Sequence, residues 1–173
     1  MLDFIEQPMG STVGEEDSKN MDNVDPDVLE LVKSIVKAAD KRKADDIRCL
    51  GVAHVTTLTD AMVVVTGNSR PQNQAIAAAI EEAVEEIDED NYLADVRVEG
   101  TADSGWMLLD YGLVMVHIMT PKSRLFYNIE GQWKQKGGKF WDIVDEWLVP
   151  NSVVESVDLS KDVAEAEDDP FWS

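Results

Sequence analysis

Residues 60–69 read Asp-Ala-Met-Val-Val-Val-Thr-Gly-Asn-Ser, and this stretch decides the fold. The run at 61–66 is too uniformly apolar for a strand with one face in water, so it predicts a central strand of a sheet. Gly67-Asn68-Ser69 ends that strand, and Ser69 is a good N-cap for a following helix. The stretch therefore predicts a buried strand that leads directly into a helix.

Two amphipathic helices are expected around this unit. Upstream, Asp25 suits an N-cap and Pro26 the first helical position, and apolar residues then recur at helical spacing. They are Val28, Leu31, Val32, Ile35, Val36 and Ala39. Downstream of Ser69, one apolar stripe comprises Ile76, Ala79, Ile80, Ala83, Val84 and Ile87. Its other side carries Glu81, Glu82, Glu85 and Glu86, which we interpret as a solvated face with a possible steering role.

The remaining elements are shorter. Strands are expected at 47–52 and 95–99, and two more at 106–110 and 113–119 form a hairpin around Tyr111-Gly112. A short helix fits 124–133. Because the hairpin must be antiparallel, the element order predicts an α/β fold, a single small domain with a mixed β-sheet flanked by helices.

The charge is strongly acidic and unevenly placed. The 173 residues hold 35 acidic and 15 basic side chains, a formal net charge of −20 with a pI near 4.2. Residues 1–25 hold 7 acids and 1 base (−6), residues 26–134 hold 18 and 11 (−7), and residues 135–173 hold 10 and 3 (−7). Such a charge disfavours free duplex nucleic acid as a direct partner, and no apolar run is long enough to predict a membrane helix.

The same division suggests the domain organisation. Residues 1–25 lack a sustained apolar period and are expected to be a disordered acidic arm, followed by the folded domain at 26–134. Residues 135–173 are predicted to be an acidic extension that begins with a hinge around Gly137-Gly138. Within it, a short amphipathic helix at 139–148 is expected, closed by Pro150. Its apolar residues are Phe140, Trp141, Ile143, Val144, Trp147 and Leu148.

The residues that could carry catalysis do not assemble into a known pattern. His117 lies in an alternating strand without a nucleophile motif, so a hydrogen-bonded structural histidine is the favoured interpretation. Cys49 is alone, which excludes an internal disulfide, and with only two histidines no metal site or cofactor is predicted. Gly67-Asn68-Ser69 faintly resembles a nucleotide-binding loop, so the alternative is a metal-dependent nucleotidyltransferase-like enzyme. The paired aspartates on a strand that such an enzyme needs are missing.

Several residues are better candidates for contact with a partner. Trp106 starts a strand beside a glycine-containing loop, where an aromatic side chain can anchor an interface. Asp110 and Tyr111 offer a carboxylate and a phenol that suit a basic protein surface, and Gly112 completes the turn.

Two stretches together resemble the ribosomal silencing factor (Iojap) family. The first is residues 60–69 with the helix that follows. The second is Trp-Met-Leu-Leu-Asp-Tyr-Gly at 106–112, then Val-His-Ile at 116–118 and Arg-Leu-Phe-Tyr-Asn-Ile-Glu-Gly-Gln-Trp at 124–133. The opening Ala-Ala-Asp-Lys-Arg-Lys-Ala-Asp-Asp-Ile at 38–47 fits the same family, and the resemblance covers about residues 28–134.

The resemblance implies a small mixed-sheet fold, distantly like nucleotidyltransferases and without established catalysis. It implies docking on the fourteenth large-subunit ribosomal protein, a basic component at the subunit-joining face, so that small-subunit joining is blocked and translation repressed, with a further role in large-subunit maturation open. Neither sequence-specific nucleic acid nor a membrane is an expected partner, and homodimerisation is left open. The implied contact residues are Trp106, Leu108, Asp110, Tyr111, Gly112, Arg124, Phe126, Tyr127, Glu130 and Trp133.

The resemblance leaves the location and the role of the arms open. The family works on bacterial-type ribosomes, and the absence of a transit-type start favours a bacterial cytoplasm. The alternative is the plastid stroma or the mitochondrial matrix, for a processed organellar form. A further alternative is an acidic adaptor whose arms, rather than its core, bind the partner.

Overall fold

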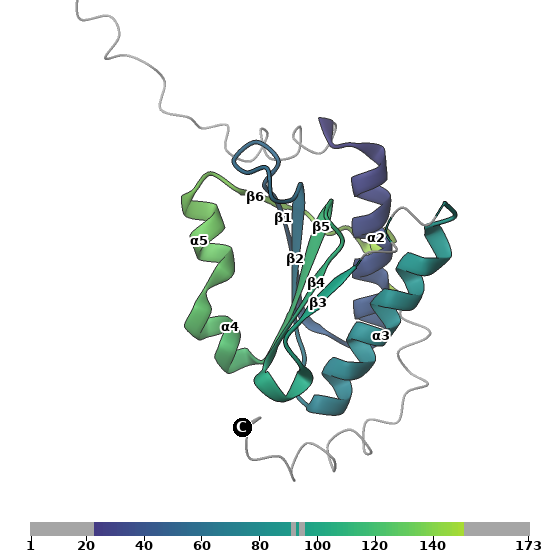
Figure 1. Cartoon of the computed structure of the whole chain (residues 1–173), viewed down its shortest axis with the longest axis vertical. Coiled ribbons are helices and arrows are strands. Elements are labelled where there is room, and N and C mark those ends of the chain that lie inside the picture. The colour runs from purple at the N-terminus through teal and green to yellow at the C-terminus, as the bar shows by residue number, and fades with distance from the viewer. Residues whose placement is uncertain (1–22, 91–92, 94–95, 151–173) are drawn as a thin grey trace, which may run out of the picture.

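The computed structural model describes residues 23–90, 93 and 96–150, and Figure 1 shows their arrangement. The helices are α2 (Pro26–Lys41), α3 (Arg70–Ile87), α4 (Pro121–Tyr127) and α5 (Ile129–Gln135). The strands are β1 (Asp45–Gly51), β2 (Ala61–Thr66), β3 (Arg97–Glu99), β4 (Trp106–Asp110), β5 (Val114–Met119) and β6 (Lys139–Trp141). Short 3₁₀ turns span Ala102–Ser104 and Asp145–Trp147.

The six strands form one mixed sheet in the order β3-β4-β5-β2-β1-β6. Only β2 and β5 are parallel, with Ala61 opposite Val114 and Thr66 opposite Met119. The other neighbours are antiparallel, including the predicted β4–β5 hairpin. Every residue of β2 is buried, which confirms the predicted central strand and the α/β fold with a mixed sheet.

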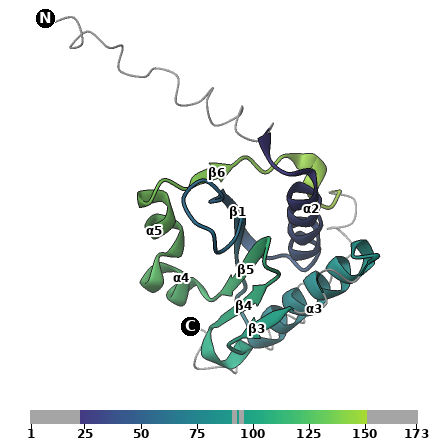
Figure 2. The same cartoon turned by 45° about the horizontal axis from the view of Figure 1, so that its top comes forward.

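Helices cover both faces of the sheet. The long helices α2 and α3 lie on one face and the shorter α4 and α5 on the other, as Figures 1 and 2 show. The first face holds the larger core, in which Ile35, Ile76 and Val63 are fully buried. The second face has a smaller core, built from Leu50, Val52, Met62, Val64 and Met119. Because α4 and α5 are short, they cover only part of this second face.

The predicted caps of both long helices are present. The Asp25 carboxylate accepts a hydrogen bond from the backbone N–H of Asp27 at 2.9 Å, and the Ser69 hydroxyl accepts one from Gln72 at 3.1 Å. Pro26 stands at the start of α2 as predicted. These contacts satisfy backbone donors that a helix start would otherwise leave unpaired.

The prediction of a helix at 139–148 is wrong. Lys139–Trp141 is instead strand β6, which pairs antiparallel with β1, and a 3₁₀ turn follows at Asp145–Trp147. A ten-residue helix is marginal by itself, whereas the edge of β1 offers backbone partners to an extended segment. Trp141 and Trp147 are buried against the main core in this arrangement. The sheet therefore continues beyond residue 134.

The segment 124–133 was expected to form one short helix, but it belongs to two helices, α4 and α5. Asn128, in the left-handed region with φ of 46°, ends α4, and its side chain accepts from the backbone N–H of Gly131 at the start of α5. The first helix begins earlier than expected, because the Thr120 hydroxyl caps it. Residues 1–22 of the acidic arm predicted at 1–25 lie outside the described residues, as does the extension beyond residue 150.

Candidate functional site

An aromatic hollow opens on the second face of the sheet, between β4 and α4. Trp106 and Leu108 contribute from β4 and Tyr127 from α4, around a volume of about 310 Å³. The ring centroids of Trp106 and Tyr127 are 4.7 Å apart, and Phe126 meets Tyr127 edge-on at 5.0 Å. We call these four residues, Trp106, Leu108, Phe126 and Tyr127, the aromatic surface.

Much of this apolar area faces solvent. The exposed fraction is 80% for Phe126 and 44% for Tyr127, and their neighbour Leu125 is 84% exposed. Trp106 and Leu108 are half-buried. A cluster of large exposed apolar side chains marks an interaction site more often than it serves stability, and a half-buried tryptophan is a typical anchor of such a site.

Trp106 is held in place by His117. Its indole N–H donates to His117 Nδ1 at 3.0 Å, and His117 is only 5% exposed. Burial lowers the pKa of His117 to about 4, so the imidazole is neutral at physiological pH. Since Nδ1 accepts, the ring proton resides on Nε2. The expectation of a hydrogen-bonded structural histidine is confirmed, and its partner is the predicted interface tryptophan.

The buried His117 predicts a loss of stability in acid. An unfolded histidine titrates near 6.5 and the folded one near 4, so the unfolded state binds more protons between these values. Stability from this residue is complete above pH 6.5 and falls as the pH drops toward 4. We expect the free energy of unfolding to decrease by about 2 kcal/mol from pH 7 to pH 5, measured by urea denaturation. A His117→Gln variant with an equally steep decrease over this range would contradict the assignment.

Arg124 and Glu130 anchor the helix pair to the sheet. The Arg124 Nε donates to Glu130 at 2.6 Å and its Nη1 donates to the Thr66 hydroxyl at 2.9 Å, while Asp46 lies 3.6 Å from Nη2. The side chains of Arg124 and Glu130 are 10% and 15% exposed. Both were predicted as contact residues, and the structure places them beneath α4 and α5, where they position the aromatic surface.

Removing the charge of Glu130 should weaken this anchor. Glu130→Gln keeps the shape of the side chain but leaves the nearly buried Arg124 without its closest counter-charge, so we expect a loss of about 2 kcal/mol in the free energy of unfolding. Urea denaturation measures it. Glu86→Gln, at an exposed position of α3, makes the same chemical change and should cost less than about 0.5 kcal/mol. Equal effects of the two substitutions would refute the anchoring role.

The other predicted contact residues lie apart from the hollow. The Asp110 carboxylate accepts from the backbone N–H of Gly112, whose φ of 79° completes the β4–β5 turn at the far end of the strand. Tyr111 is buried in the main core on the opposite face, where burial raises the pKa of its hydroxyl. Trp133, on α5, packs against the second core.

Three residues that line the hollow were not predicted from the sequence. Glu99, on β3, and Ser104, in the 3₁₀ turn before β4, line it together with Gly100. The alternation of polar and apolar residues at 95–99 indicated a strand but did not indicate which other strand it would pair with. Only the pairing of Glu99 with Leu108 brings β3 to the site.

The loop that motivated the enzymatic alternative is filled by the chain itself. The backbone N–H of Asn68 donates to the Gln72 side chain at 2.7 Å, and that of Gly67 donates to the Met119 carbonyl at 3.3 Å. The buried Asn73 side chain occupies the space beside Gly67. These two backbone N–H groups are therefore already engaged within the chain. Across residues 23–90 and 96–150, no group of three or more His, Cys, Asp or Glu could hold a metal ion.

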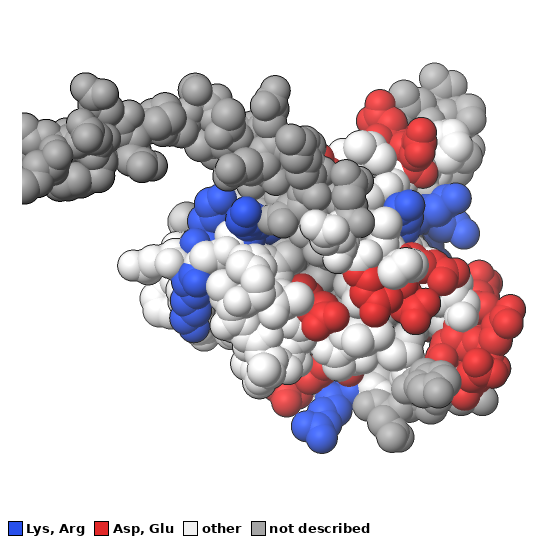
Figure 3. Space-filling model, turned by 90° about the horizontal axis from the view of Figure 1, so that it is seen from above, with Lys and Arg blue, Asp and Glu red and all other residues white. Residues whose placement is uncertain are grey.

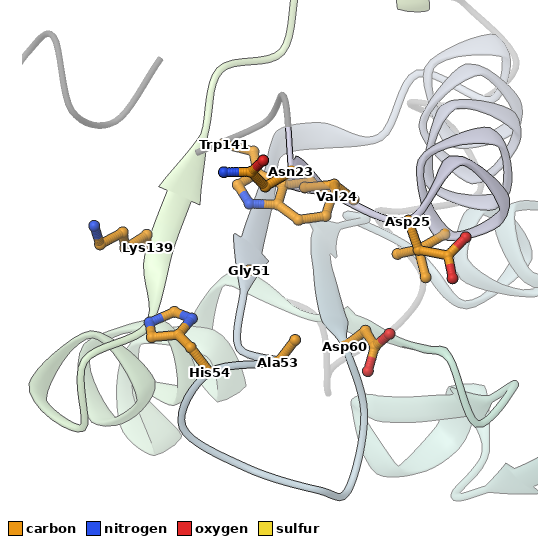
Figure 4. Close-up of a pocket in the computed structure, with 10 residues that line it drawn as sticks. Asn23, Val24, Asp25, Gly51, Ala53, His54, Asp60, Lys139 and Trp141 are labelled. Carbon is orange, nitrogen blue, oxygen red and sulfur yellow. The ribbon is translucent and has the colours of Figure 1, made fainter. Parts of the chain in front are cut away.

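A second hollow, of about 330 Å³, lies between the start of α2 and strands β1 and β6 (Figure 4). Lys139 and His54 stand on one side of it and Asp25 and Asp60 on the other, with Trp141 behind. The His54 Nε2 lies 2.6 Å from the Gly137 carbonyl oxygen. None of the predicted contact residues lines it.

The described part of the chain holds no helix of the length and apolarity needed to span a membrane.

Fold and site together define a small α/β domain that presents a partly exposed aromatic surface on one face of its sheet. The comparison with known families then identifies it further. The chain belongs to the ribosomal silencing factor family: the family model described as "Ribosomal silencing factor during starvation" matches residues 25–169. This confirms the resemblance seen in the sequence.

Relatives and solved structures agree. The chain is 32% identical over 104 residues to "Ribosomal silencing factor RsfS" of Halalkalibacterium halodurans, covering 60% of this chain and 86% of that one. It is 35% identical over 106 residues to "Protein Iojap, chloroplastic" of Zea mays, covering 61% and 44%. An X-ray structure of a Chromobacterium violaceum protein matches with a TM-score of 0.53 at 33% identity, covering 62% and 86%. A Bacillus halodurans crystal structure matches with 0.54 at 28%, covering 66% and 99%.

Proposed function

We propose that this protein binds the large ribosomal subunit through its fourteenth ribosomal protein and sterically blocks joining of the small subunit. The observation that carries the proposal is the aromatic surface, with Trp106 locked by His117 and Phe126 80% exposed. Its chemistry suits an interface: a rigid, half-buried aromatic anchor surrounded by contacts that exclude water.

Charge supports a basic protein as the partner. Glu99 lines the aromatic hollow, whereas the carboxylate of Asp103, in the 3₁₀ turn before β4, is paired with Arg70 at 3.1 Å. The net charge of −20 raises the rate of encounter with a positively charged surface and disfavours bare nucleic acid. A basic ribosomal protein fits both requirements.

The mechanism is occupancy without turnover. A folded body bound at the joining face excludes the small subunit for as long as it stays bound, so repression follows the fraction of large subunits occupied. No reacting group is required. Because the curated relatives are bacterial and chloroplast proteins, we place the protein on bacterial-type ribosomes, in a bacterial cytoplasm or an organelle.

The test is cosedimentation with isolated large subunits, followed by a subunit-joining assay. The protein should pellet with large subunits, should not pellet with small subunits, and should lower the yield of joined ribosomes as occupancy rises. An unchanged yield of joined ribosomes at a saturating concentration of the protein would contradict the proposal. Deleting residues 1–22 and 151–173 addresses the adaptor alternative, and retained binding by the shortened chain would reject it.

A further inference from the structure

Two lysines at the end of α5 form a small basic cluster on this acidic protein. Lys134 and Lys136 are exposed there, whereas Lys139, at the start of β6, lines the second hollow on the other face of the sheet. We call Lys134 and Lys136 the lysine cluster. Figure 3 shows Lys and Arg side chains toward the left of the molecule, the side on which α5 lies in Figure 1, with others at the right and lower edges, and most Asp and Glu toward the right.

Aromatic rings rather than carboxylates hold these cations. The Lys136 Nζ lies 4.5 Å from the ring centroid of Trp133, and the Lys134 Nζ lies 5.5 Å from that of Phe140. Within the part of the chain that the structure describes, no carboxylate forms an ion pair with either lysine. A ring orders an ammonium group but does not neutralise it, so the positive charge stays available to a partner.

The neighbouring Arg48, unlike these lysines, forms ion pairs with carboxylates. Its guanidinium also lies over the Phe140 ring, at 5.6 Å, but it pairs with Asp46 at 3.0 Å and with Glu130 at 3.7 Å. Arg48 therefore belongs to the anchor beneath the helix pair. The charge that remains open for binding is that of the lysine cluster.

The acidic side chains of α3 lie far from the lysine cluster. The glutamates of α3 lie on the other face of the sheet from α5 (Figure 2). Layers pack about 10 Å apart, so helices on opposite faces are separated by about 20 Å, well beyond the Debye length of about 8 Å at physiological salt. A polyanion at the lysine cluster is consequently screened from the α3 carboxylates.

We infer that the lysine cluster contacts the phosphate backbone of ribosomal RNA beside the protein partner, an inference that rests on the proposed function. Ammonium groups act as point charges that suit phosphates at variable geometry, whereas recognition of carboxylates favours the arginine fork, and the arginine here is already paired. The contact is independent of sequence, because backbone phosphates carry no base information.

The arrangement of α4 and α5 allows the protein contact and the RNA contact at the same time. Helix α4 carries Phe126 and Tyr127 and helix α5 carries Lys134, and the two are consecutive and fastened by the Arg124–Glu130 pair. The aromatic surface and the lysine cluster therefore belong to one rigid unit. A ribosomal surface presents RNA next to protein, so a helix pair seated on the protein component would bring the lysines to adjacent phosphates.

The experiment measures the affinity of the full chain for purified large subunits over a range of KCl concentrations. Each lysine on a phosphate contributes about 1 to the slope of log affinity against log salt, so Lys134→Gln with Lys136→Gln should make the slope shallower by about 2. The matched control is Lys37→Gln with Lys41→Gln, at exposed positions of α2, which should leave the slope unchanged. An equal slope for wild type and the α5 double variant would overturn the inference.

A crosslinking measurement identifies the partner. A diazirine amino acid placed at the exposed Gln135, next to the cluster, should crosslink to ribonuclease-sensitive material in large subunits. Crosslinks to ribosomal protein alone would overturn the RNA assignment and point to an acidic protein segment instead. If the wild-type chain does not bind large subunits, the proposed function and this inference fall together. If it binds with the same salt slope after the α5 substitutions, only the inference fails.

Discussion

We expect Trp106→Ala to weaken binding of the protein to isolated large ribosomal subunits by about 30-fold or more. Truncating a tryptophan anchor at the centre of an interface typically costs 2 kcal/mol or above, and a loss of 2 kcal/mol corresponds to about 30-fold in the dissociation constant. Here the indole also packs 4.7 Å from the Tyr127 ring, so its removal disturbs a second interface residue. Cosedimentation across a range of protein concentrations measures the change.

The controls for Trp106→Ala separate loss of contact from loss of fold. Because the substitution leaves His117 without its donor, urea denaturation must show that the variant is folded at the temperature of the binding assay. Phe126→Ala, at an 80% exposed position, tests the same surface with little effect on the core. Leu58→Ala, 64% exposed in the loop after β1, should bind like wild type. Wild-type affinity in both Trp106→Ala and Phe126→Ala would place the interface elsewhere.

We expect Leu50→Ala to lower the free energy of unfolding by about 3 kcal/mol. Leu50 is fully buried in the smaller core beneath α5, and a leucine-to-alanine change at such a site loses transfer free energy and leaves a cavity. A decrease of this size shifts the melting temperature by roughly 10 °C in a domain of this length. Thermal and urea denaturation, read by circular dichroism, measure it.

The same substitution at an exposed leucine supplies the control. Leu58→Ala removes the same atoms from a side chain that is 64% exposed, so it should change the free energy of unfolding by less than about 0.5 kcal/mol. Equal effects at positions 50 and 58 would mean that the smaller core contributes little to stability. In that case α4 and α5 would not be held as firmly as the proposed site requires.

Local sequence predicted the elements that carry their own signals. The apolar run at 61–66, the cap at Ser69 and the apolar stripe of α3 lie within about 30 consecutive residues, so β2 and α3 were foreseen almost residue by residue. The β4–β5 hairpin was foreseen for the same reason, since its turn sits between two apolar runs. The family motif at 106–112 likewise pointed to Trp106 and Leu108 in the hollow.

Tertiary contacts decided which of the predicted contact residues face outward. Tyr111 ended in the main core because it follows β4 on the face covered by α3, and Arg124 and Glu130 turned inward to meet Thr66 and each other. Neither outcome depends on the residue's own neighbours in the chain. Glu99 joined the hollow only because β3 pairs with β4.

Residues 139–148 show the same difference between local sequence signals and tertiary contacts. Their apolar spacing favoured a helix, but ten residues supply too little helical stability to resist an alternative, and β1, about 90 residues away, offered a row of backbone hydrogen bonds. The sequence by itself determined the central strand and the two long helices, because these depend on local periodicity and capping. Only the tertiary structure decided the edge strand β6 and the inward turn of Tyr111, Arg124 and Glu130, because strand pairing and burial depend on contacts between residues far apart in the chain.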